Sequence, residues 1–156
     1  VRVYFGTMQE NKDKMTKKIF GVLERNNVLL EPVNETRYHL AGDIDAGLVG
    51  QWMTIQGQVD GSHIADAVVA NVEKNSGKVT RAGLLVDQAP ALPPEANGQG
   101  AYLYQQSKGR YLLVSDGPVN SPVSGDFRAF VGQEVKVAGE FGAVNYVLYN
   151  AKVSAK

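Results

Sequence analysis

Short stretches in which apolar and polar residues alternate run through most of the chain, separated by glycine and asparagine. The clearest is residues 52–59, Trp-Met-Thr-Ile-Gln-Gly-Gln-Val, in which every second side chain belongs to one face. A period of two is typical of a strand with one buried face. The pairs Asn26-Asn27 and Asp60-Gly61 adjoin such stretches and suit tight hairpin turns, because these residue types tolerate a positive φ. The pattern predicts a nearly all-β protein.

The predicted strands fall into two groups of similar plan. In each group a segment that suits a single helical turn, residues 44–49 or 127–131, precedes the last two strands. The first group of strands comprises residues 20–25, 28–31, 38–40, 52–59 and 64–72, and the second comprises 101–106, 110–115, 134–141 and 145–153.

Two blocks of nine residues match without a gap, since both begin with Val-Gly-Gln, continue with alternation and end in glycine. Shorter matches lie upstream and downstream of each block in the same order. Such self-similarity indicates an internal duplication, with chance similarity between β-hairpins as the alternative. The matching segments are 41–43, 49–57 and 70–72 in the first copy and 124–126, 131–139 and 151–153 in the second.

Short strands, a plug segment before the last two and glycines at bends describe a small, partly open barrel. The Val-Gly-Gln block resembles the start of the fourth strand in bacterial OB-fold proteins, where Gly-Lys-x-Val-x-Val-x-Gly is common. Gln51 and Gln133 stand where lysine is usual. The resemblance implies two tandem OB-like barrels, and a minimal β-sandwich is the alternative.

The remaining segments differ in composition from the two copies. Residues 8–19, rich in Lys, Glu and Gln, are the one plausible helix, and residues 81–86 suit a strand between two loop-like pieces. The predicted organisation is an N-terminal arm at 1–17, a first repeat at 18–74, a linker with a possible strand at 75–99 and a second repeat at 100–156.

Charge and composition narrow the possible partners. Sixteen acidic residues balance sixteen basic ones, so the chain lacks the positive field that attracts phosphate backbones. It contains no cysteine and no run of about eighteen apolar residues, so neither disulfides nor a transmembrane segment is expected. The first residue is Val1 rather than Met. We therefore expect a processed bacterial protein in a periplasmic or extracellular setting.

No pattern of catalytic or metal-binding residues is visible. His39 and His63 do not have a metal-ligand spacing. Residues 43–47, Asp-Ile-Asp-Ala-Gly, resemble the start of a calcium loop but lack its distal Glu, so turn and cap chemistry is expected there. No Gly-x-Ser-x-Gly motif surrounds a serine. We expect no enzyme activity, no metal and no cofactor.

Aromatic residues concentrate in the second copy. Two of them, Tyr102 and Tyr104, lie two positions apart and share a strand face. An exposed pair would form a stacking platform for sugars, bases or a partner protein. The alternative is that the tyrosines fill the seam between the repeats. The candidate ligand-binding residues are Tyr102, Tyr104, Lys108, Arg110, Tyr111, Tyr146 and Tyr149.

These observations favour a non-catalytic binding module that recognises a protein, a glycan or another extended ligand. One alternative is a self-assembling structural subunit, in which the extended segment with Val1, Val3 and Phe5 adds to a neighbour's sheet edge. The other is a weak binder of single-stranded nucleic acid, for which the neutral charge is unfavourable.

Overall fold

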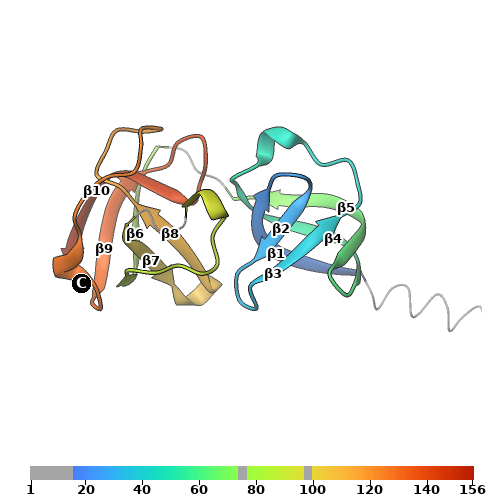
Figure 1. The fold of residues 1–156 in the computed structure, drawn as a ribbon, viewed down its shortest axis with the longest axis horizontal. Helices are drawn as coiled ribbons and strands as arrows, with labels where there is room; N and C mark the ends of the chain where they lie inside the picture. The colour runs from blue at the N-terminus through green and yellow to red at the C-terminus, as the bar shows by residue number, and fades with distance from the viewer. Residues whose placement is uncertain (1–15, 74–76, 97–99) are drawn as a thin grey trace, which may run out of the picture.

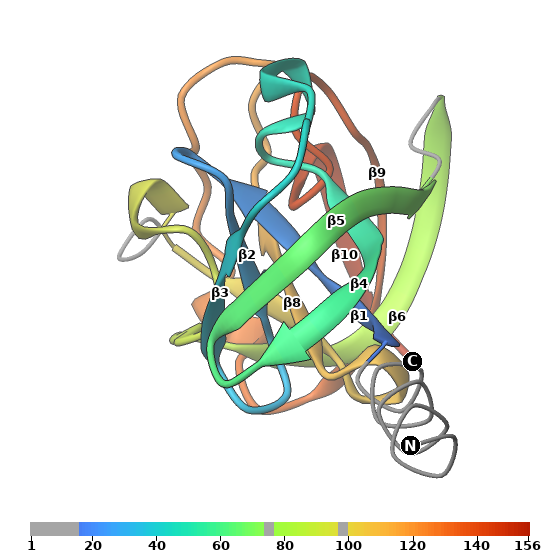
Figure 2. The same ribbon diagram turned by 90° about the vertical axis from the view of Figure 1, so that its right-hand side faces the viewer.

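The computed structural model describes residues 16–73, 77–96 and 100–156. They form two five-stranded β-barrels that lie side by side (Figure 1). Viewed at 90° to that direction, the first barrel lies in front of the second (Figure 2). The prediction of a mainly β chain with two small tandem barrels is confirmed.

The first barrel closes in the order β1-β2-β3-β5-β4. Only β3 and β5 pair in parallel within it, and the other neighbours are antiparallel. A short 3-10 helix, η1 (Ala46–Leu48), precedes β4. The strands are β1 (Thr16–Glu24), β2 (Val28–Glu31), β3 (Thr36–Leu40), β4 (Trp52–Asp60) and β5 (His63–Val72).

The second barrel has the same connectivity, in the order β6-β7-β8-β10-β9, with β8 and β10 as its parallel pair. Three further 3-10 helices, η2 (Pro94–Ala96), η3 (Gln106–Lys108) and η4 (Arg128–Phe130), lie in its connections. The strands are β6 (Lys78–Val86), β7 (Tyr102–Gln105), β8 (Arg110–Val114), β9 (Glu134–Glu140) and β10 (Val147–Ala155).

The Val-Gly-Gln motif makes the same turn in both barrels. Leu23 exchanges backbone hydrogen bonds with Gly50 and Gln51 at 2.8 and 3.1 Å, and Leu85 does the same with residues 132–133 at 2.7 and 3.0 Å. The glycine of each motif has a φ near +90°, at 90° and 89°, which disfavours any residue with a side chain. The matched blocks in the sequence therefore mark a structural repeat.

The second barrel begins earlier than the sequence pattern predicts. Residues 75–99 were expected to be a linker with a possible strand at 81–86, whereas β6 spans Lys78–Val86 and pairs with both β7 and β9 as part of the second barrel. Gly83 in β6 corresponds to Gly21 in β1. At both positions a Cβ would lie within 2.5 Å of a carbonyl oxygen of the neighbouring strand. A five-stranded barrel closes only with this strand. The second repeat thus extends from Lys78 rather than from Gly100.

The predicted helix at residues 8–19 is wrong where the structure describes it. Residues 16–19 belong to β1 and pair with β4, in a register that places Ile19 opposite Ile55. The ladder hydrogen bonds and the partly buried Ile19 outweigh the helix propensity of the lysines. Residues 8–15 of that prediction, and the segment with Val1, Val3 and Phe5, lie outside the described residues.

Apolar side chains on the outer surface of the first barrel pack against the second barrel. Val22, Leu30 and Trp52 are fully buried there, in one cluster with the core of the second barrel. The ring of Trp52 stacks on that of Phe20, with centroids 5.3 Å apart, and the Arg110 guanidinium lies 5.6 Å from the Trp52 ring centroid. The interior of the first barrel is a separate cluster that includes Leu23, Leu29, Met53, Ile55 and Ile64.

Asn145 links the barrels by three hydrogen bonds. Its backbone N–H donates to the Gly50 carbonyl at 3.1 Å. Its Oδ1 accepts from the Trp52 backbone N–H at 2.5 Å, and its Nδ2 donates to the Glu73 carbonyl at 3.3 Å. The side-chain amide of Gln51 adds a bond to the Ala143 carbonyl at 2.6 Å. These directional contacts fix how one barrel sits on the other.

Candidate ligand-binding face

Tyr104 and Tyr111 form a pair of aromatic rings on the outer surface of the second barrel. They are register partners on β7 and β8, and their ring centroids are 4.9 Å apart with an interplanar angle of 41°. Because side chains alternate along a strand, Leu103 and Leu112 point into the barrel and are fully buried. The tyrosines point outward and remain half-buried, so part of each ring faces solvent.

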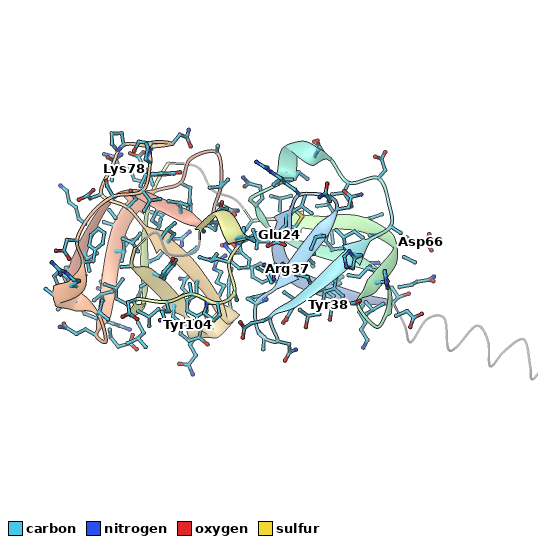
Figure 3. All side chains as sticks on the ribbon, viewed as in Figure 1. Glu24, Arg37, Tyr38, Asp66, Lys78 and Tyr104 are labelled. Carbon is cyan, nitrogen blue, oxygen red and sulfur yellow. The ribbon has the colours of Figure 1, made fainter. Side chains whose placement is uncertain are left out.

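Two hollows flank Tyr104, which is labelled in Figure 3. One lies over the second barrel alone, and the other lies between the barrels. The first is lined by Ala82, Gly83, Leu84, Tyr104, Gln105, Gln106, Ser107, Glu134 and Lys156. The second is lined by Pro32, Val33, Glu35, Pro90, Ala91, Tyr104, Gly109 and Tyr111.

Tyr111 keeps its proton at neutral pH. Burial raises the pKa of its phenol above the ordinary value of 10, and the charges of Tyr104 and Glu35 raise it further. A protonated phenol can both donate and accept a hydrogen bond. The pair thus combines apolar ring surface with polar edges, the combination that recognition sites for polar ligands use.

Arg110 and Lys108 both bind the first barrel, Arg110 as a buried residue and Lys108 with its side chain half-exposed. Arg110 is 2% exposed and forms a bidentate ion pair with Glu73, which follows β5. Lys108 lies 3.3 Å from the same carboxylate. Burial raises the pKa of Glu73, but hydrogen bonds and the charge of Arg110, with help from Lys108, hold it below its ordinary value. These two candidates act as interface residues in the structure.

The other three candidate tyrosines, Tyr102, Tyr146 and Tyr149, do not lie with the Tyr104–Tyr111 pair. Tyr102 is 1% exposed, and its hydroxyl donates to the Ala96 carbonyl at 3.0 Å. Tyr149 is 7% exposed, and burial raises its pKa. Tyr146 is half-buried next to Gly50 of the first barrel. Tyr146 therefore lies in the seam between the two repeats, which was the alternative prediction for the tyrosines.

A third hollow lies across β6, β9 and β10, on the outer surface of the second barrel. Lys78 and Lys152 line it together with Glu140, and the Asn150 amide donates to the Glu140 carboxylate at 2.6 Å. Mixed charges of this kind do not form the continuous cationic track that a nucleic acid backbone requires.

The Asp-Ile-Asp-Ala-Gly segment has the predicted capping role. The Asp45 carboxylate accepts a hydrogen bond from the Gly47 N–H at 2.8 Å, at the start of η1. In the second barrel Asp126 accepts from the Arg128 N–H at 3.1 Å, before η4. Among residues 16–73, 77–96 and 100–156, no three His, Asp or Glu side chains gather into a metal-binding group.

The two histidines, 24 positions apart in the sequence, lie side by side. His39 on β3 and His63 on β5 are register partners, with ring centroids 5.4 Å apart. Sequence spacing gave no sign of this contact, because the parallel pairing of the third and fifth strands creates it.

Comparison of the chain with family models, curated proteins and solved structures found no match. Within the part of the chain that the structure describes, no helix has the length and apolar character needed to cross a membrane.

Proposed function

We propose that the chain is a non-catalytic binding module of two OB-like barrels, whose second barrel holds an extended, uncharged ligand across β7 and β8. Support comes first from topology. The first, second, third, fifth and fourth strands follow each other around both barrels, as in five-stranded OB barrels, which bind oligonucleotides and oligosaccharides over their second and third strands. In the second barrel those strands are β7 and β8.

The Tyr104–Tyr111 pair carries the proposal. Two partly exposed rings, 4.9 Å apart and tilted by 41°, offer apolar ring surface to a sugar ring or a base, and stacking of a base on an aromatic ring contributes about 1–3 kcal/mol. The hollows on either side of Tyr104 let a ligand continue beyond the pair. A ligand longer than one ring unit therefore fits this face best.

The surroundings of the pair favour an uncharged ligand. Gln106 and Ser107, both exposed, offer amide and hydroxyl groups beside Tyr104. Glu73 engages both nearby cations, Lys108 and Arg110, so no more than about one net positive charge, on the half-exposed Lys108, remains for a phosphate backbone. We therefore favour a neutral oligosaccharide over single-stranded nucleic acid.

Self-assembly by repetition of the barrel-to-barrel contact is disfavoured. In the first barrel the Glu73 N–H donates to the Trp52 carbonyl, and both residues contact the second barrel. In the second barrel the Lys156 N–H donates to the Glu134 carbonyl, so Glu134 and Lys156 occupy the equivalent positions. A third barrel docking there would meet Glu134 in place of an indole and Lys156 in place of a carboxylate. Assembly would need another contact.

The experiment compares ring-removing with ring-keeping variants. Neutral oligosaccharides, acidic oligosaccharides, extended peptides and an oligo-dT strand are titrated against the full chain and against the variants Tyr104→Ala, Tyr111→Ala, Tyr104→Phe and Tyr111→Phe. For a bound neutral oligosaccharide we expect each Ala variant to bind at least about tenfold more weakly, the effect of about 1.4 kcal/mol. Each Phe variant keeps the ring and stays near the parent affinity.

Two outcomes contradict the proposal. Ala variants that bind the oligosaccharide as tightly as the parent would remove the tyrosine pair from the site. Binding that is found only with oligo-dT and falls steeply with added salt would instead assign the surface to nucleic acid. The melting temperature of each variant serves as the control for folding.

A further inference from the structure

Closure of the first barrel brings the only two histidines of the sequence together. His39 and His63 are register partners in the parallel β3–β5 pair, and the backbone N–H of His39 donates to the Ser62 carbonyl at 2.8 Å. Their ring centroids are 5.4 Å apart with an interplanar angle of 32°. Both side chains are exposed, so the rings can turn without disturbing the barrel.

The equivalent pair in the second barrel has a different character. Leu113 and Val147 are the first register partners of the parallel β8–β10 pair, and they are 1% and 3% exposed. At the matching place in the first barrel, two imidazoles face solvent. The barrel thus does not need these histidines for its core, and their proximity is a property of the surface.

We infer that His39 and His63 together chelate one divalent late transition-metal ion, such as Zn²⁺ or Cu²⁺. Imidazole nitrogen is a preferred ligand of these ions. A metal bonded to one nitrogen of each ring at about 2.0–2.1 Å places the ring centroids roughly 4.5–5.5 Å apart for bond angles between square and trigonal. The observed 5.4 Å lies within that range.

The site holds two protein ligands and leaves the other coordination positions to water. Asp60 is the register partner of His63 on β4, but the described residues contain no set of three His, Asp or Glu arranged for a metal. Such a site exchanges its ion readily, unlike a four-ligand structural zinc site. It lies on the first barrel, so the inference is independent of the tyrosine pair on the second.

The sequence makes the test unusually selective, because the full chain has two histidines and no cysteine. We would titrate ZnCl₂ into the full chain and follow the two imidazoles by ¹⁵N-edited NMR. Both sets of signals are expected to shift together and to saturate at one ion per chain. Shifts of one imidazole alone, or independent saturation of the two, would overturn the shared site.

Calorimetry on the variants His39→Gln and His63→Gln measures the contribution of each ring. Loss of either should weaken Zn²⁺ binding by at least about tenfold, since losing even an outer partner of a ligating histidine costs 10–100-fold. The double variant should be little weaker than either single one. Parent-like affinity in either single variant would contradict the inference. Both positions are exposed, and melting curves check that the variants fold.

Two controls separate this site from other sources of binding. Ca²⁺ should not shift the imidazole signals, because it takes oxygen ligands. Light scattering with and without Zn²⁺ should give the same mass. A zinc-dependent dimer would mean that the ion bridges two copies of the chain, which would overturn chelation within one barrel.

Discussion

Glu73, which directly follows the last strand of the first barrel, forms a bidentate ion pair with Arg110 at the start of β8 in the second barrel. Arg110 is almost fully buried, whereas the Glu73 side chain is 20% exposed. The guanidinium also donates to the Gln105 side chain at 2.9 Å. A buried cation is tolerated only with such partners, so the first barrel supplies what the second needs to bury its own arginine.

Removing the carboxylate charge should destabilise the protein. The variant Glu73→Gln leaves Arg110 buried without its counter-charge, and we expect a loss of about 1.5–3 kcal/mol in the free energy of unfolding, typical of a hydrogen bond to a charged group. Urea denaturation measures this. The matched control is Glu24→Gln, which breaks the Arg37–Glu24 ion pair of the first barrel (Figure 3). Arg37 is well exposed, so this loss should stay below about 1 kcal/mol.

The same pair should make stability depend on pH in acid. The Glu73 pKa in the folded protein lies below its ordinary value of 4.5, so its contribution is complete above 4.5 and disappears as the pH falls through the folded pKa. The difference in unfolding free energy between the parent and Glu73→Gln should therefore shrink as the pH is lowered from about 7 to well below 4.5, with the loss confined to the range below about 4.5. A difference that stays constant over this range would show that the Glu73 charge is not the origin of the stabilisation.

Unfolding should be a single transition for both barrels. Trp52 is the only tryptophan and is fully buried against the second barrel, so its fluorescence reports the interface, while circular dichroism reports all strands. We expect the two denaturation curves to coincide, the behaviour of one cooperative unit. A fluorescence change that precedes the loss of strand signal would mean that the barrels separate before they unfold.

Two glycines provide a matched test of the interface. Gly50 and Gly132 have nearly the same positive φ, so alanine at either should cost about 1–3 kcal/mol in backbone strain. A Cβ at position 50 would also lie 2.3 Å from a methyl carbon of Val144, whereas one at position 132 meets nothing within 4 Å. Gly50→Ala should therefore be more destabilising by about 1–3 kcal/mol. Thermal denaturation of both variants gives the difference, and equal losses would contradict it.

The sequence revealed the repeated turn but not the full extent of the second barrel. Val-Gly-Gln was recognisable because each glycine has nearly the same positive φ and donates the same backbone hydrogen bond, to Leu23 or to Leu85. A strand at residues 81–86 was expected, but it was assigned to the linker because its likeness to β1 is short, with Gly83-Leu84-Leu85 standing for residues 21–23. The connection from β6 to β7 is also much longer than the turn from β1 to β2, so the spacing gave no help.

The candidate site was predicted in its residue type but not in its pairing. Tyr102 and Tyr104 share a strand face as expected, but Tyr102 is covered and Tyr104 pairs with Tyr111 across the β7–β8 hairpin. Whether Tyr102 is covered and Tyr104 is exposed depends on where the connection at residues 87–96 and the first barrel lie. The tertiary fold sets both positions, so the sequence pattern does not reveal them. The contact between His39 and His63 depends in the same way on barrel closure.

The hollow between the barrels has walls from both of them, with Pro32 and Val33 on one side and Tyr104 and Tyr111 on the other. A molecule seated there would contact two separately folded units at once, so its binding free energy would add to the attraction between them. Conversely, a change that loosens the contact at Glu73 or Asn145 would lower affinity without touching the binding residues. Occupancy of the hollow and cohesion of the two barrels are thus thermodynamically linked quantities.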